Sequence, residues 1–440
     1  MAQDPSPSSG PAPTPVRRPW WTYVIPYPGR VPKLGRPQWR LLGLLSAAEL
    51  FDQYDMGILS FGLHHIQQGL GIGEADVGAV MAAVRLGVVP ALAVTLLADR
   101  LGRRRLLLVT ILGFTLATFA TAFSRNVHDF MVFQFLARLF IYAETMLAVV
   151  VLAEELQASD RGWGIGMLGA LGALGHGLAA IVFGFVEVLP FGWRALYAVG
   201  ILPMLLVAWL RRTLPETRRF ERHREARHDR GSWRDWLRPL AHVIRMYPGR
   251  IAVVCGALVP LEFTVMTAAA FMVKILQEVH GYTPGEVTLL YIGGGGLAIL
   301  GNVAAGALSD RLGRRLVMSV LVGAAGIGFY GFYNLRGWLV PVAWIVQVFA
   351  ITGVGVLFKA LGSELFPTSY RSTASGIRAI AGTLGGVAGL ALEGRLYELA
   401  GSHAAAITLM IPSLIIPPLV IYAFLPETAT RELEDIAPER

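Results

Sequence analysis

Long apolar segments separated by short polar breaks run along most of the chain. Each is about 20 residues long or more, which is the length an α-helix needs to cross a bilayer. Because the segments are apolar throughout instead of alternating, they predict helices and not the strands of a β-barrel. The pattern therefore predicts an all-α polytopic membrane protein with twelve transmembrane helices, at residues 41–66, 76–97, 104–124, 129–152, 162–186, 192–211, 250–274, 285–308, 315–334, 338–361, 372–396 and 403–425.

The composition agrees with a membrane protein and excludes a soluble one. The 440 residues are 54% hydrophobic and only 15% charged, whereas soluble domains are about 25% charged. Cys255 is the only cysteine, which excludes an intrachain disulfide and a metal site built on cysteines. No nucleophile with a base, and no set of metal ligands, occurs at a recognisable spacing, so we expect neither an enzyme nor a bound cofactor or metal.

The net charge of +8 comes from the polar parts of the chain. Residues 211–250 alone contain twelve arginines and five acids, 12 − 5 = +7. Because arginine-rich loops stay in the cytoplasm and no groove-reading motif accompanies them, we expect a plasma (inner) membrane protein with both termini cytoplasmic and no nucleic-acid partner. The predicted parts are a disordered cytoplasmic tail (1–40), a six-helix bundle (41–211), a basic cytoplasmic linker (212–249), a second six-helix bundle (250–425) and a cytoplasmic tail (426–440).

Three short motifs occur twice at nearly the same separation. Residues 99–104 read DRLGRR, and residues 310–315 read the same six letters 211 positions later. A glutamate followed seven residues later by an arginine recurs at an offset of 210, and the tripeptide PET recurs at 215–217 and 426–428. A shared offset for separate motifs indicates two homologous halves of six helices each.

Together these features resemble the major facilitator superfamily over essentially the whole chain. Within it, FDQYDMGILSF (51–61), AETMLAVVVLAEELQASDRG (143–162) and ELFPTSYRSTASG (364–376) resemble the metabolite:proton symporter and niacin or aromatic-acid transporter branches, which are related to sugar porters. The resemblance implies two pseudo-symmetric six-helix bundles that work by alternating access. Helix 11 of that branch often carries an arginine where this chain has Thr383, with Arg378 five positions earlier.

Ionisable residues inside the apolar segments are the candidates for the transport site. A charge in a membrane span is costly unless it faces water or a partner. We expect the three acids of the first segment, which share one side of its helix, to face the central cavity, and Asp52 or Asp55 to take up the coupling proton. Arg85 or Arg138 would balance this charge and meet a substrate carboxylate, although buried structural ion pairs are an alternative. The candidates are Glu49, Asp52, Asp55, Arg85, Arg138, Glu144 and Glu262.

The duplicated motifs are the candidates for a cytoplasmic gate. Their arginines can pair with acids across the cytoplasmic face, and such pairs would hold the outward-open state shut inside. The candidate gate residues are Asp99, Arg100, Gly102, Arg103, Arg104, Glu154 and Arg161 in the first half, and Asp310, Arg311, Gly313, Arg314, Arg315, Glu364 and Arg371 in the second.

We therefore predict a secondary active transporter that moves a small organic solute by proton-coupled symport, with an organic or aromatic acid as the favoured substrate class. The proton gradient is the expected driving force, and we expect a monomer surrounded by membrane lipids. The alternatives are a proton-driven exporter, a facilitator for organic cations or sugars, and a non-transporting sensor on the same fold.

Overall fold

The computed structural model describes residues 19–23, 31–96, 101–157, 160–212, 242–367, 370–425 and 427, and all regular elements in this part of the chain are helices. The first half contains η1 (Trp20–Tyr23), α1 (Arg36–Phe61), α2 (Leu63–Leu70), η2 (Glu74–Asp76), α3 (Val77–Arg85), α4 (Val88–Leu96), α6 (Arg103–Ala122), α7 (Val127–Glu155), α8 (Arg161–Phe183), α9 (Trp193–Val199) and α10 (Ile201–Arg211). The second half contains α13 (Pro248–Glu278), α14 (Pro284–Leu312), α15 (Arg314–Asn334), α16 (Leu339–Glu364), α17 (Arg371–Ala400), α18 (His403–Met410), η4 (Ile411–Ile415) and α19 (Ile416–Phe424).

Each of the twelve predicted segments coincides with one helix or with a short series of consecutive helices. Ten helical stretches of the described residues are long and apolar enough to cross a membrane. The other two predicted segments contain α1, of 26 residues, and α14, of 29 residues, which also have the length of a span. The predicted all-α fold class is therefore confirmed.

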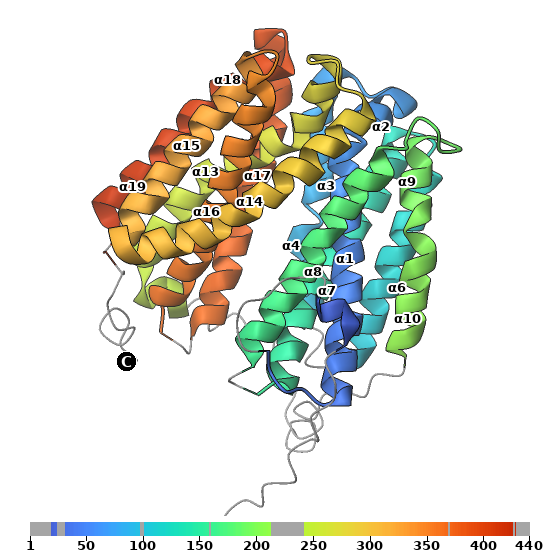
Figure 1. The fold of residues 1–440 in the computed structure, drawn as a ribbon, viewed down its shortest axis with the longest axis vertical. Coiled ribbons are helices and arrows are strands. Elements are labelled where there is room, and N and C mark those ends of the chain that lie inside the picture. The colour runs from blue at the N-terminus through green and yellow to red at the C-terminus, as the bar shows by residue number, and fades with distance from the viewer. Residues whose placement is uncertain are drawn as a thin grey trace, which may run out of the picture.

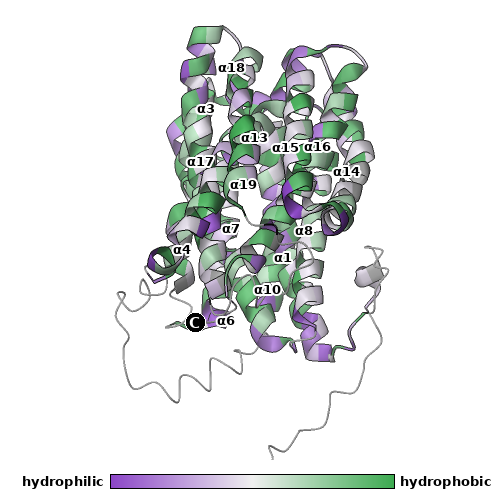
Figure 2. Ribbon diagram, turned by 90° about the vertical axis from the view of Figure 1, so that its left-hand side faces the viewer, coloured by the Kyte–Doolittle hydropathy of each residue, from purple (hydrophilic) through white to green (hydrophobic). Residues whose placement is uncertain are grey.

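The outer surface of the helices is apolar. Figure 2 shows hydrophobic and neutral colours over much of the helical surface. Large apolar side chains point outward, among them Leu202, Ile327 and Leu419, each more than 60% exposed. Such a surface would aggregate in water and is suited to contact with lipid.

The helices of the two halves form two bundles, which Figure 1 separates by colour into blue to green and yellow to red. The bundles contact one another through α3 with α17, α8 with α14, and α1 and α2 with α13. In Figure 1 they lie closest near the end that carries α2. The exact boundaries of the tails and linker stay predictions, since most of residues 1–30, 213–241 and 428–440 lie outside the described part.

The glycine of the duplicated motif has the same backbone conformation in both halves. Gly102 has φ 94° and ψ 145°, and Gly313 has φ 94° and ψ 146°. Side chains are strained at such positive φ values, so glycine is the residue that fits this turn. Both glycines directly precede a helix, α6 and α15, so the repeat read from the sequence is also a repeat of local structure.

Candidate functional site

A buried ion pair links α1 to α7 inside the first bundle. A guanidinium nitrogen of Arg138 lies 3.4 Å from a carboxylate oxygen of Asp55, and both side chains are almost fully buried. Thr118 of α6 donates a hydrogen bond of 3.1 Å to the other oxygen of Asp55. Gln134, one turn before Arg138 on α7, accepts a hydrogen bond from its guanidinium. Asp55 is therefore held by partners from two neighbouring helices.

A second buried ion pair lies nearby, between Glu144 of α7 and Arg211 at the end of α10. Their closest atoms are 2.6 Å apart and both side chains are at most 2% exposed. Asp52 lies among these charges, with Glu144, Glu49 and Arg211 as electrostatic neighbours. Neither carboxylate oxygen of Asp52 has a hydrogen-bond partner among the described residues, although the side chain is buried.

The third acid of α1, Glu49, is hydrogen-bonded on both oxygens. Gln53 donates to one oxygen at 3.1 Å and Thr145 of α7 donates to the other at 3.0 Å. The cluster thus holds four carboxyl groups (Glu49, Asp52, Asp55 and Glu144) and two arginines (Arg138 and Arg211). If all were ionised, its net charge would be 2 − 4 = −2.

The expectation that the acids of α1 face a central cavity between the halves is wrong for Asp52 and Asp55. The partners of Asp55 come from α6 and α7, and the charged neighbours of Asp52 on other helices come from α7 and α10, all of the first bundle. The three-residue spacing does place the acids on one side of α1, but that side faces the interior of its own bundle. The physical reason is the pair of buried arginines, which attracts the acids inward.

Another group of charges lies where the two bundles meet. Glu262 of α13 has Arg85 of α3 and Arg378 of α17 as electrostatic neighbours, so the group joins both halves. Arg85 also donates a hydrogen bond of 2.9 Å to the sulfur of Met266. One oxygen of Glu262 and the Nε of Arg85 are buried without a hydrogen-bond partner in the described residues. With two arginines and one acid, the group has a net charge of 2 − 1 = +1.

Two ion pairs between gate candidates occupy equivalent positions in the two halves. Arg103 lies 3.2 Å from Glu154 in the first half, and Arg314 lies 3.0 Å from Glu364 in the second. Arg314 also pairs with Asp310 at 2.7 Å. Each pair joins helices of the same bundle, so in this state the ion pairs stabilise each bundle separately and do not connect the two.

The second half adds an acid that caps a helix. Glu427, from the second PET tripeptide, accepts hydrogen bonds from the backbone amides of Arg314 and Arg315 at 2.8 and 3.4 Å. A carboxylate at the N-terminus of α15 also interacts favourably with the dipole of this helix. The corresponding tripeptide of the first half, residues 215–217, lies outside the described residues.

The remaining gate candidates donate to backbone oxygens, are exposed, or lie outside the described residues. Arg161 and Arg104 donate to the backbone oxygens of Leu156 and Arg212. Arg311 is exposed near the end of α14. Asp99 and Arg100 lie outside the described residues, as does the side chain of Arg371.

Several functional candidates were missed by sequence reasoning. Arg211, the last residue of the predicted first bundle, was not among the candidates, although it is buried inside that bundle. Lys274 and Glu393 lie within predicted spans and are completely buried. The same rule that selected Asp52, an ionisable residue inside an apolar segment, would have selected these two.

Comparison with known proteins agrees with this arrangement. A sequence model described as "Major Facilitator Superfamily" matches residues 45–259 and 254–439. This chain belongs to the major facilitator superfamily. The family resemblance is thereby confirmed, and the chain is an integral, multi-pass membrane transport protein.

Curated relatives of this chain carry names of transporters. It is 24% identical to the niacin transporter NiaP of Acinetobacter baylyi, covering 81% of this chain and 86% of that protein. It is 25% identical to the gallate transporter of Pseudomonas putida, covering 82% and 86%. It is also 25% identical to the 4-hydroxybenzoate transporter PcaK of Pseudomonas aeruginosa, covering 85% and 89%.

Solved structures share the same fold. The xylose transporter XylE from E. coli, in its inward open conformation, matches with a TM-score of 0.73 and covers 91% of this chain and 99% of its own. The crystal structure of the nucleoside transporter NupG matches with a TM-score of 0.71, covering 89% and 100%. The identities are 18% and 14%, so these matches describe the fold alone.

Proposed function

We propose that this chain is a proton-coupled symporter that imports a small aromatic or other organic acid across the plasma membrane by alternating access. Three relatives named for niacin, gallate and 4-hydroxybenzoate support the substrate class, because all three compounds are aromatic carboxylic acids. The proposed oligomeric state is a monomer in the lipid bilayer, and the proposed orientation has both termini in the cytoplasm.

The observation that carries the coupling proposal is the environment of Asp52. Its side chain is buried in the first bundle, and no described residue hydrogen-bonds to either oxygen. Three other carboxyl groups and only two arginines surround it, so a full set of charges there would be strongly unfavourable. Binding a proton at Asp52 removes one of the uncompensated charges, which makes this residue the proposed carrier of the coupling proton.

The proposed substrate site is the Arg85, Glu262 and Arg378 group between the bundles. Its net charge of +1 is offset when one carboxylate binds, and a guanidinium can form two parallel hydrogen bonds with a carboxylate. Arg378 lies on α17, five positions before Thr383, and so supplies an arginine on the helix where related transporters often carry one. Because the group contains residues of both halves, bound substrate would contact both moving parts.

The ion pairs Arg103 with Glu154 and Arg314 with Glu364 are proposed to regulate the cytoplasmic end. They belong to their own bundles here. We propose that they exchange for contacts between the bundles when the cytoplasmic end closes. Their role would then be to set the populations of the two states and not the affinity for substrate.

Uptake into proteoliposomes tests this function. Purified protein is reconstituted, and a panel of radiolabelled niacin, gallate and 4-hydroxybenzoate is offered outside with an inward proton gradient. Symport predicts accumulation above the outside concentration, and its loss when an ionophore collapses the gradient. Expulsion of preloaded acid under the same gradient would indicate an exporter. Ligand binding without any flux would indicate a sensor.

A further inference from the structure

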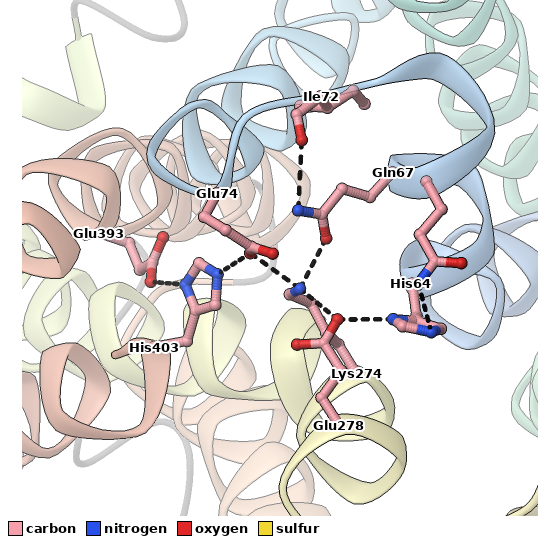
Figure 3. Close-up of polar contacts among 9 residues, drawn as sticks. His64, Gln67, Ile72, Glu74, Lys274, Glu278, Glu393 and His403 are labelled. Atoms are coloured by element: carbon pink, nitrogen blue, oxygen red, sulfur yellow. Dashed lines mark hydrogen bonds and ion pairs between the residues drawn. The ribbon is translucent and has the colours of Figure 1, made fainter. Parts of the chain in front are cut away.

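A polar network joins the two bundles near α2, and no part of the proposed transport site uses it. We call it the His403 network; it consists of His64, Gln67, Glu74, Lys274, Glu278, Glu393 and His403 (Figure 3). Its centre is Lys274 of α13, whose side chain is completely buried. The Lys274 ammonium contacts Glu74 at 2.9 Å, Gln67 at 2.6 Å and Glu278 at 2.5 Å. Glu74 and Gln67 belong to the first half, so these contacts hold the bundles together.

His403, the first residue of α18, lies between two carboxyl groups. Its Nδ1 is 2.6 Å from an oxygen of Glu393, and its Nε2 is 2.7 Å from an oxygen of Glu74 (Figure 3). The rings of Phe271 and Tyr397 are within 4.6 Å of the imidazole, centroid to centroid, so the ring is held on its faces as well. Glu393 is completely buried, and His403 is its hydrogen-bond partner on one oxygen.

The two contacts of His403 bear on the number of protons that its imidazole carries. A neutral imidazole carries one N–H, and its other nitrogen is an acceptor. An acceptor nitrogen placed 2.6 to 2.7 Å from an ionised carboxylate would bring two lone pairs together without a hydrogen. Both contacts become hydrogen bonds when the imidazole carries two N–H groups, that is, when one further proton is bound.

We propose that His403 is a proton-binding site, separate from Asp52, whose proton holds the two bundles together at this end. The charged and titratable groups that face it are Glu74 of η2, Glu393 and Tyr397 of α17, and Lys274 of α13, while Glu278 and His64 lie beyond Lys274. With His403 protonated, it and Lys274 offset two of the three carboxylates. Without that proton, Glu74 and Glu393 face one neutral ring.

Water reaches the site through Glu74, whose side chain is 42% exposed, while Glu393 is not exposed at all. α13 runs from its start at Pro248 to Lys274, and α14 returns to the DRLGRR turn at Gly313, so the network and the duplicated motifs lie at opposite ends of the membrane. With both termini in the cytoplasm, as proposed above, the network lies at the outer end of the helices and responds to the pH outside the cell. That assignment of side rests on the proposed function, but the proton site itself does not.

Proton linkage determines the direction in which pH shifts the fraction of molecules whose bundles are joined. A protonated His403 donates to Glu74 across the bundles, so acid favours the joined state and rising pH favours separation at this end. For one proton, the ratio of joined to separated molecules falls by up to about tenfold per pH unit. Glu393→Gln should remove the part of this dependence that comes from His403, because the amide can donate to Nδ1 of a neutral imidazole and needs no further proton.

Nitrogen NMR of the full-length protein in nanodiscs, with ¹⁵N-labelled histidine, tests the proton directly. The His403 signal is assigned by its loss in His403→Gln. The proposal expects both ring nitrogens to be protonated in the wild type, at a pH at which Glu393→Gln shows a neutral ring. A neutral His403 in the wild type at that pH, with the bundles joined, would overturn the proposal.

The joined state is monitored by the distance between spin labels at Phe123→Cys and Leu399→Cys, two exposed positions, in a Cys255→Ser background. The joined fraction should fall more steeply with rising pH in the parent than in Glu393→Gln. Glu74→Gln, a change at a partly exposed residue, gives a second variant if Glu393→Gln folds poorly. Equal pH dependence in the parent and in a folded variant would contradict the proposal, whether or not the protein transports aromatic acids.

Discussion

At the scale of single residues, two aspartates one turn apart on α1 have different environments. Asp55 has an arginine and a threonine as partners. Asp52 has neighbouring charges but no hydrogen-bond partner among the described residues. A carboxylate that is part of an ion pair stabilises the bundle, whereas a carboxyl group without a partner can gain and lose a proton at less structural cost. We therefore propose Asp52 for coupling and Asp55 for structure.

Substitution of the two aspartates should separate these roles. Asp52→Asn should abolish accumulation driven by a proton gradient and leave exchange of labelled for unlabelled substrate intact, because the amide mimics the protonated acid. Asp55→Asn leaves the buried Arg138 without its carboxylate partner and should destabilise the protein by about 3 to 5 kcal/mol. Accumulation and exchange are measured in proteoliposomes, and stability by thermal unfolding in detergent. Gradient-driven accumulation that survives in Asp52→Asn would rule out the coupling assignment.

The arginine on α17 gives a second prediction at this scale. Arg378→Gln removes a charge-assisted contact to the substrate carboxylate, worth about 1.5 to 3 kcal/mol, and should weaken binding about 10- to 150-fold. Equilibrium binding of the acid that is transported best measures the change. Arg336→Gln, at an exposed arginine outside the gate and the substrate site, is the matched control and should bind normally. Unchanged affinity in Arg378→Gln would place the substrate elsewhere.

Single residues also show the limit of sequence reasoning. The cost of a charge in lipid is a local property, so an apolar segment that contains Asp52 or Glu262 identifies the candidate directly. Which partner neutralises that charge depends on how the helices pack. For this reason the pairing of Glu144 with Arg211, 67 positions later, and the direction in which Asp52 points were accessible only from the structure.

At the scale of elements, the two DRLGRR turns are the best-predicted local structures. Their repetition indicated one structural unit used twice, and the glycine torsions agree to within a degree. The ends of the helices were predicted to within a few residues, because polar breaks mark where each segment leaves the hydrocarbon. The kinks that divide the first, second, sixth and twelfth spans into shorter helices were not predicted, since they do not interrupt the apolar pattern.

The turn conformation predicts the effect of adding a side chain. Gly313→Ala must adopt a positive φ, and its Cβ would lie 2.7 Å from an oxygen of Glu427, so we expect a loss of about 1 to 2 kcal/mol in stability. Gly323→Ala in the helical part of α15, where a Cβ meets nothing within 4 Å, should be neutral or slightly stabilising. Thermal unfolding of the two variants side by side makes the comparison. Equal stability would show that the turn is not constrained.

At the scale of the whole molecule, the two ends of the bundles are held by different interactions. The His403 network connects the halves at one end, and the Arg103 and Arg314 ion pairs strengthen each half at the other. A transporter that alternates between two states needs contacts of this kind that form in one state and break in the other. We interpret this structure as the state that is closed at the end of α2.

Neutralising Glu154 and Glu364 should shift the balance between the states. If the proposed gate is right, Glu154→Gln with Glu364→Gln weakens contacts of the state that is closed at the end of the DRLGRR turns. The joined fraction seen by the Phe123 and Leu399 spin labels should then rise. Substrate affinity measured in the joined state should stay the same. A change in affinity without a change in the joined fraction would assign these residues to the binding site instead.

The most direct test of the central claim follows protons and substrate together. Proteoliposomes that contain a pH-sensitive dye, with no proton gradient imposed, receive an aromatic acid that the protein transports. Symport through Asp52 predicts that the interior acidifies as the acid enters in the wild type, and that Asp52→Asn exchanges the acid without moving protons. Acid entry with no carrier-dependent acidification in the wild type, or unchanged acidification in Asp52→Asn, would contradict the account.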